Sequence, residues 1–220
     1  MVQTKEKRMY MRVRNVCGLL GTILPWLALF SAGLTHHESP DWWWSISATY
    51  YQSPALVGVL VPASIVLLFY IGYDKLDNII TSLSGVFGLL IVLFPCKVSW
   101  INDGNPVGFF QVPIEISAII HNVSAMVFFL LIAFNSVYLF TKTGGEMTPR
   151  KRIRNMIYRI CGWSMVAIMV VFLVLKLLHA PGYSIMIVEI LLLTLFGISW
   201  LVKGEAFPFL NDVEEAEPTK

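Results

Sequence analysis

The sequence predicts an all-α polytopic membrane protein, with six transmembrane helices in one bundle and both termini in the cytoplasm. Hydrophobic residues fill 56% of the 220 positions and charged residues only 14%, whereas a soluble chain carries about 25% charged residues. A single soluble core could not bury so many apolar side chains, so lipid must surround much of the chain. The second observation is that the basic residues gather between the apolar runs in a pattern that sets orientation.

Six apolar runs are long enough to be spans, because about 20 residues at 1.5 Å per residue match a hydrocarbon core of about 30 Å. The expected spans are residues 16–34, 53–73, 78–95, 115–140, 156–178 and 183–202. They form a transmembrane domain over residues 16–202, between a basic cytoplasmic segment, 1–15, and an acidic cytoplasmic tail, 203–220. A cleaved signal peptide is the alternative for the first run, although Phe30 stands where cleavage needs a small residue before Ala32.

The distribution of Lys and Arg gives the orientation. Of the 16 basic residues, 14 fall in segments that six spans place on the cytoplasmic side, while Lys97 falls outside and Lys176 lies in the fifth span. The net charge of +2 therefore reflects topology and gives no indication of a nucleic-acid partner. The basic run from Arg150 to Arg154 could bind anionic lipid head groups, or it could simply hold its loop inside.

Ionisable side chains within a span are costly in lipid, so they are candidates for function. Glu189 lies about two turns inside the sixth span, and His121 lies about two turns inside the fourth. Lys176, near the outer end of the fifth span, could reach the membrane surface or pair with Glu189. In this topology all four histidines lie in the half of the protein nearer the outer face of the membrane. They are His36, His37, His121 and His179.

These residues predict a polar pocket in the outer leaflet, below the polar and aromatic loop of residues 36–51. Ser117, His121 and Ser124 share one helix face, because they are spaced by four and three residues. The pocket would be built from Ser45, Ser47, Tyr51, Glu115, His121, Ser124, Lys176, His179 and Glu189. We expect it to bind a membrane lipid or a small ligand without a cofactor, in a sensor, an accessory protein or a transport component.

The alternative is an intramembrane metal-dependent hydrolase that acts on a lipid-like substrate. His37, His121 and His179 would then bind zinc, with Glu189, Glu115 or Asp41 as the fourth ligand or the general base. The sequence contains no HxxxH or HExxH spacing that would bring two histidines together on one helix. Residue patterns leave open whether the protein is an enzyme.

Several stretches carry a resemblance to known proteins. SISATYY at 45–51, GYDKLDN at 72–78, SLSGVFGLLIVLFPC at 82–96, HNVSAMVFF at 121–129 and RNMIYRICGW at 154–163 together resemble a family of small bacterial integral membrane proteins. The resemblance implies a six-helix fold in the bacterial cytoplasmic membrane and no particular activity. A remoter resemblance is to the superfamily of alkaline ceramidases and adiponectin receptors, whose seventh span carries HxxxH. Six spans are expected here, and the sixth has no histidine.

Overall fold

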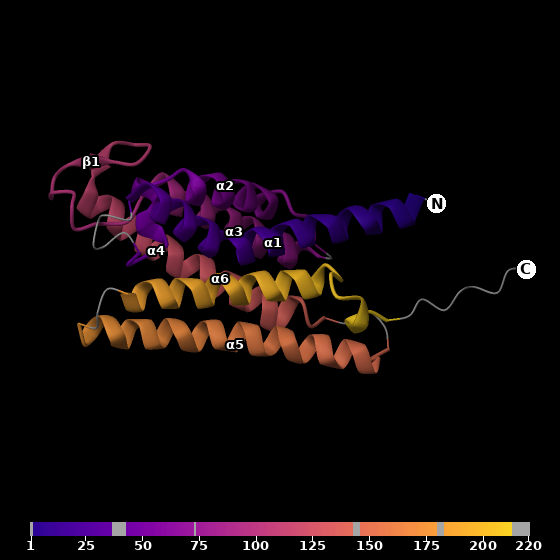
Figure 1. Ribbon diagram of the computed structural model, residues 1–220. Coiled ribbons are helices and arrows are strands. Elements are labelled where there is room, and N and C mark those ends of the chain that lie inside the picture. The colour runs from indigo at the N-terminus through magenta and orange to yellow at the C-terminus, as the bar shows by residue number, and fades with distance from the viewer. Residues whose placement is uncertain (1, 37–42, 73, 143–145, 180–182, 213–220) are drawn as a thin grey trace, which may run out of the picture.

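The computed structural model describes residues 2–36, 43–72, 74–142, 146–179 and 183–212 (Figure 1). Within these ranges the chain is an all-α bundle of α1 (Val2–His36), α2 (Ala55–Leu68), α3 (Lys75–Leu93), α4 (Ile114–Phe134), α5 (Pro149–Leu177) and α6 (Tyr183–Lys203). The short elements are η1 (Ser47–Tyr51), β1 (Pro106–Val107), β2 (Val112–Pro113), the π-helical turn η2 (Asn135–Leu139) and η3 (Pro208–Leu210). The β1–β2 hairpin lies at one end of the bundle, the hairpin end. The start of α1 and the end of α6 lie at the other, the terminal end (Figure 1).

Five helices of the described chain are long and apolar enough to cross a membrane: α1 from Lys7 to Thr35, α3, α4 with η2, α5 and α6. This is the architecture of a multi-pass membrane protein. The expected second span, residues 53–73, is shorter than predicted, because α2 has 14 residues and is about 21 Å long. It ends at Leu68, whose carbonyl accepts a hydrogen bond from the Ser82 hydroxyl at 2.9 Å. A helix of this length does not cross a core of about 30 Å by itself.

Two other helices begin earlier than the apolar runs indicate. α1 begins at Val2, so most of the basic segment 1–15 is helical. α5 begins at Pro149, where the Thr148 side chain accepts a hydrogen bond from the Lys151 amide at 3.0 Å. A threonine N-cap followed by proline at the first helical position is a strong start signal, and it extends the helix beyond the apolar run. Residues 213–220 of the acidic tail lie outside the described residues.

Small residues bring the helices into close contact, as they commonly do between helices in lipid. A Cβ added to Gly197 of α6 would lie 2.8 Å from the Gly18 oxygen and the Thr22 nitrogen of α1. A Cβ added to Gly85 of α3 would lie 2.5 Å from the Leu68 nitrogen of α2. Gly85 therefore lets α3 pack closely against α2, and Gly197 lets α6 pack closely against α1.

The core of the bundle contains a column of aromatic rings. Phe128 contacts Phe196 at 5.9 Å between ring centroids, and Phe196 contacts Trp200 at 6.2 Å. Trp200 continues to Phe140 at 5.3 Å, and Phe140 contacts Tyr158 at 5.5 Å. All except Phe140 are at most 2% exposed, and Phe140 is 4% exposed. This column, from Phe128 to Tyr158, fills the middle of the bundle and links α4, α5 and α6.

Candidate functional site

A carboxylate on α6 holds the loop that precedes η1. The Glu189 carboxylate accepts hydrogen bonds from the Ser45 hydroxyl at 2.9 Å, from the Ile46 amide at 2.6 Å and from the hydroxyl and amide of Ser47. These hydrogen bonds join residues that are more than 140 positions apart in the sequence. The sequence predicted these three polar side chains to share a pocket, and the structure brings them into direct contact.

Two further contacts fasten the same loop to the start of α6. The ring of Trp43 stacks on Tyr183 with 6.1 Å between centroids, and the Met186 amide donates to the Trp44 carbonyl at 3.1 Å. The amides of a first helical turn have no partner within their own helix, so the loop carbonyl satisfies one of them. Residues 37–42, which include His37, Asp41 and Trp42, lie outside the described residues.

His121 holds the end of α3. Its buried Nδ1 lies 3.0 Å from the Ile91 carbonyl oxygen and 2.9 Å from that of Phe94. Carbonyl oxygens only accept, so Nδ1 carries the ring proton, and in the neutral ring Nε2 is the nitrogen that accepts. Ser117, one turn earlier on the same face, donates to the Pro95 carbonyl at 2.8 Å. The polar face predicted on the fourth helix therefore caps the carbonyls at the end of α3.

Six of the nine predicted pocket residues line one cavity of about 430 Å³ at the hairpin end, which we call the hairpin-end cavity. They are Ser45, Ser47, His121, Lys176, His179 and Glu189. Lys176 and His179 are exposed, and His179 has a left-handed backbone with φ 53° at the end of α5. The volume falls in the range of about 300–1,000 Å³ that is typical of small-ligand sites.

The other three predicted residues do not line this cavity. The Tyr51 hydroxyl donates to the Cys96 carbonyl at 2.9 Å, and burial raises the pKa of Tyr51, which keeps the hydroxyl protonated. Glu115 accepts from the Gly104 amide at 2.7 Å in the connection between α3 and α4. Ser124 is buried on the inner face of α4. Tyr51 and Glu115 thus hold loop backbone in place through these hydrogen bonds. In a loop the sequence alone does not show where a side chain points.

The apolar wall of the hairpin-end cavity was not predicted. Each of α4, α5 and α6 contributes a mostly apolar stripe with the spacing i, i+3, i+4, i+7. The stripes consist of Asn122, Ala125, Met126 and Phe129 on α4, of Met169, Phe172, Leu173 and Lys176 on α5, and of Ile185, Val188, Glu189 and Leu192 on α6. Helical periodicity is the signal that could have found them. It is hidden here because the lipid-facing positions of the same helices are equally apolar.

Of the two alternatives for Lys176, the described residues do not form the ion pair with Glu189. Lys176 and Glu189 both line the cavity but make no ion pair, because the η1 loop occupies the carboxylate. No three His, Cys, Asp or Glu side chains of the described ranges lie close enough to hold a metal ion. His37, one of the three proposed ligands, is outside those ranges, so the zinc alternative stays a prediction.

Comparison with known proteins adds no identity. The chain matches no protein-family model, no curated protein and no solved structure. The resemblance to a bacterial membrane-protein family stays a prediction.

Proposed function

We propose that this protein binds a single-chain amphiphile, a lipid or a lipid-like small molecule, in the hairpin-end cavity. The observation that carries the proposal is one cavity with two kinds of wall. Stripes from α4, α5 and α6 make most of it apolar, and His121, Lys176 and Glu189 add polar groups. An apolar chain would lie along the stripes, because binding there removes apolar surface from water.

The polar groups indicate what the head of such a ligand offers. Nε2 of His121 accepts a hydrogen bond, and the Lys176 ammonium donates. The Glu189 carboxylate is already used by the loop, so it orients that wall and contributes negative charge. A head group with a hydroxyl or amide, which both donates and accepts, matches this set better than a bare anion does.

We further propose that the protein lies in the bacterial cytoplasmic membrane, with six crossings and both termini inside. Arg8, Arg12 and Arg152 are near the terminal end, where positive residues are retained on the cytoplasmic side. Six crossings require that α2, together with the residues on either side of it, spans the membrane. Reporter fusions after residues 36, 72, 105, 144, 181 and 212 test this topology, which is wrong if any two successive sites report the same side.

A dansyl-labelled fatty acid and the full chain in detergent test ligand binding. Ala125→Trp fills the cavity from α4, whereas Val123→Trp places the same side chain on the exposed face of that helix. Leu173→Trp and Val174→Trp form the corresponding pair on α5. We expect the two cavity variants to weaken binding by about tenfold or more, which is about 1.4 kcal/mol, and the two controls to leave it unchanged. Equal affinities within both pairs would exclude this cavity as the binding site.

The metal-dependent hydrolase remains a second candidate because of one contact. A histidine that binds a metal commonly donates its other ring nitrogen to a carbonyl, as Nδ1 of His121 does. His37 and His179 would be its partners in binding zinc. Metal analysis of the purified protein tests this candidate: stoichiometric zinc that is lost in His121→Ala supports it, and metal content equal to that of a mock purification rejects it.

A further inference from the structure

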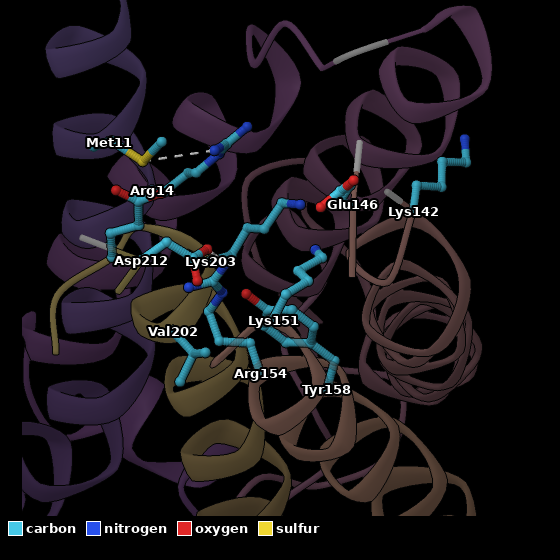
Figure 2. Close-up of a pocket in the computed structure, with 11 residues that line it drawn as sticks. Met11, Arg14, Lys142, Glu146, Lys151, Arg154, Tyr158, Val202, Lys203 and Asp212 are labelled. Carbon is cyan, nitrogen blue, oxygen red and sulfur yellow. Dashed lines mark hydrogen bonds and ion pairs between the residues drawn. The ribbon is translucent and has the colours of Figure 1, made fainter. Parts of the chain in front are cut away.

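A second cavity, of about 450 Å³, lies at the terminal end and has a strongly basic lining (Figure 2). Its walls come from α1, the α4–α5 connection, α5, α6 and the segment after α6. We call it the basic cavity, because five cations line it: Arg14, Lys142, Lys151, Arg154 and Lys203. They outnumber the lining carboxylates, which are Glu146, Glu205 and Asp212.

Topology explains why these residues are positive but does not explain why they are buried. Arg14 is 3% exposed, and Arg154 and Lys203 are each 8% exposed. A cation that only retains a loop on one side can stay in water, as the exposed Arg12 and Arg152 do. Burying a cation costs free energy unless partners compensate for the lost water. All three have partners within the chain: Arg14 donates to the Tyr70 hydroxyl at 2.8 Å, Arg154 to the Leu210 carbonyl at 2.6 Å and Lys203 to the Phe140 carbonyl at 3.3 Å. Topology does not explain why three such cations gather around one cavity.

Two lysines are directed to the same point in the cavity wall. Nζ of Lys151 and Nζ of Lys203 each lie 3.3 Å from the carbonyl oxygen of Phe140. Both ammonium groups also lie near the ring of Tyr158, at 5.9 and 6.0 Å from its centroid. Phe140 directly follows the π-helical turn η2, and such turns are frequent at functional sites. The turn thus places one carbonyl between two cations from different helices.

The side chains that line the basic cavity include five cations and three carboxylates. Arg154 pairs with Asp212 at 2.7 Å, and Lys142 pairs with Asp74 at 2.6 Å. Arg14, Lys151 and Arg154 lie close enough to Lys203 to repel it, while Asp77 lies close enough to attract it. A ligand with several acceptor oxygens and negative charge would offset this repulsion, and phosphate is the common group that accepts from Arg and Lys together.

We propose that the basic cavity binds a phosphate group. The phosphate belongs either to the head group of an anionic lipid at this face of the membrane or to a free phosphate-bearing molecule. Arg14 of α1 and Lys203 of α6 would hold it from two sides, with Lys151 as a third donor. The proposal does not depend on the ligand of the hairpin-end cavity, because the two cavities share no lining residue.

The test measures the thermal unfolding midpoint of the full chain in two kinds of nanodisc. Phosphatidylcholine nanodiscs are titrated with inorganic phosphate at constant ionic strength, with chloride as the reference anion. Nanodiscs that contain phosphatidic acid present the same phosphate on a lipid. A rise of the midpoint with free phosphate identifies a soluble ligand, and a rise with phosphatidic acid alone identifies a lipid. The absence of both would overturn the proposal.

A pair of double variants separates the cavity from general charge attraction. Arg14→Gln with Lys203→Gln removes two charges from the cavity, and Arg12→Gln with Arg152→Gln removes two exposed charges from the same end. We expect the first pair to weaken phosphate binding by about tenfold or more and the second to leave it nearly unchanged. Equal loss in both pairs would overturn the proposal. Should the first pair fail to fold, Lys151→Gln must show the same selective loss.

Discussion

The hairpin-end cavity and the basic cavity are similar in size, at about 430 and 450 Å³, but they are opposite in chemistry. Apolar stripes line the first, and its one carboxylate is satisfied by the neighbouring loop. Cations from four parts of the chain line the second. The first therefore suits a chain that avoids water, and the second suits a charged group.

The two cavities also have a common support. Phe128 lines the hairpin-end cavity and Tyr158 lines the basic cavity, and the aromatic column connects these two rings through the core. α6 contributes Glu189 to one site and Lys203 to the other. One rigid helix thus positions two chemically different sites, so variants in α6 can show whether the sites are independent.

The largest expected effect concerns the low polarity of the hairpin-end cavity. Burial, with the nearby Glu189 charge as the second cause, raises the pKa of the Cys96 thiol to about 12. At pH 8 the reactive thiolate is therefore scarce, and we expect iodoacetamide to alkylate Cys96 roughly a thousandfold more slowly than an exposed cysteine. The rate should rise about tenfold per pH unit up to pH 11.

An exposed cysteine nearby provides the control for this prediction. Ser99 is exposed, so Ser99→Cys in a Cys96→Ser background reports the reactivity of a solvated thiol at the same end. Peptide mapping after timed labelling measures both rates. Glu189→Gln should speed the alkylation of Cys96, because it removes the charge that disfavours the thiolate. Equal rates for the two positions would show that the surroundings of Cys96 in the hairpin-end cavity do not disfavour the thiolate.

The next effect compares two carboxylates that the sequence placed in one pocket. Glu189→Ala removes the acceptor of several loop hydrogen bonds and should lower the free energy of unfolding by about 3 kcal/mol. Glu115→Ala removes a single exposed hydrogen bond and should cost about 1 kcal/mol or less. Denaturant unfolding in detergent measures both. Similar costs would show that the loop before η1 does not depend on Glu189.

A smaller effect is expected where α1 and α6 meet between the two cavities. Gly197→Ala places a methyl group 2.8 Å from backbone atoms of Gly18 and Thr22, so the helices must separate, at a cost of about 2 kcal/mol. Because α6 serves both sites, binding of the dansyl fatty acid and of phosphate should weaken together. Gly58→Ala is the control, since a Cβ there meets nothing within 4 Å and alanine favours the helix. Loss at one cavity alone would show that the sites do not share α6 as a rigid support.

The sequence predicted the all-α bundle, which the structure confirms. Six of the nine residues that it named for a pocket line the hairpin-end cavity, and ligand binding there stays a prediction. Ser45, Ser47, His121 and Glu189 could be found because polar side chains stand out within or beside apolar runs. The length of α2 could not be predicted, because it depends on the Ser82 contact with Leu68 across a helix pair. The roles of Tyr51 and Glu115 could not be predicted either, because they depend on the geometry of loops that these side chains contact.

The basic cavity was missed because the positive-inside rule already explained all five of the cations that line it. Arg12 and Arg14 are two residues apart on the same helix, and the positive-inside rule treats them alike. Only the packing of α1 shows that one is exposed and the other buried. On a helix, two residues that are two positions apart point to different sides. The helical spacing of the basic residues, and not their number, is therefore the signal that could show which of them face the bundle.

The smallest expected effect compares ion-paired carboxylates at the two ends. The Thr148 hydroxyl and Arg154 lower the pKa of Asp212 below its usual 3.8. A lowered pKa stabilises the folded state above the unfolded value, and this contribution is lost as the pH falls below about 4. Because Asp212 is 41% exposed, it amounts to about 1 kcal/mol or less. Asp212→Asn should therefore lower stability slightly at pH 7 and not at pH 2.

The same substitution tests the basic cavity. Asp212 places a negative charge in the lining of the basic cavity, so Asp212→Asn should tighten phosphate binding about two- to threefold. Asp103, which pairs with Lys97 in the connection between α3 and α4, is the matched carboxylate at the hairpin end. Asp103→Asn makes the same change in net charge, and titration calorimetry should find its phosphate affinity unchanged. If both variants tighten binding equally, phosphate senses the charge of the whole chain and the two ends do not differ in the way their side chains indicate.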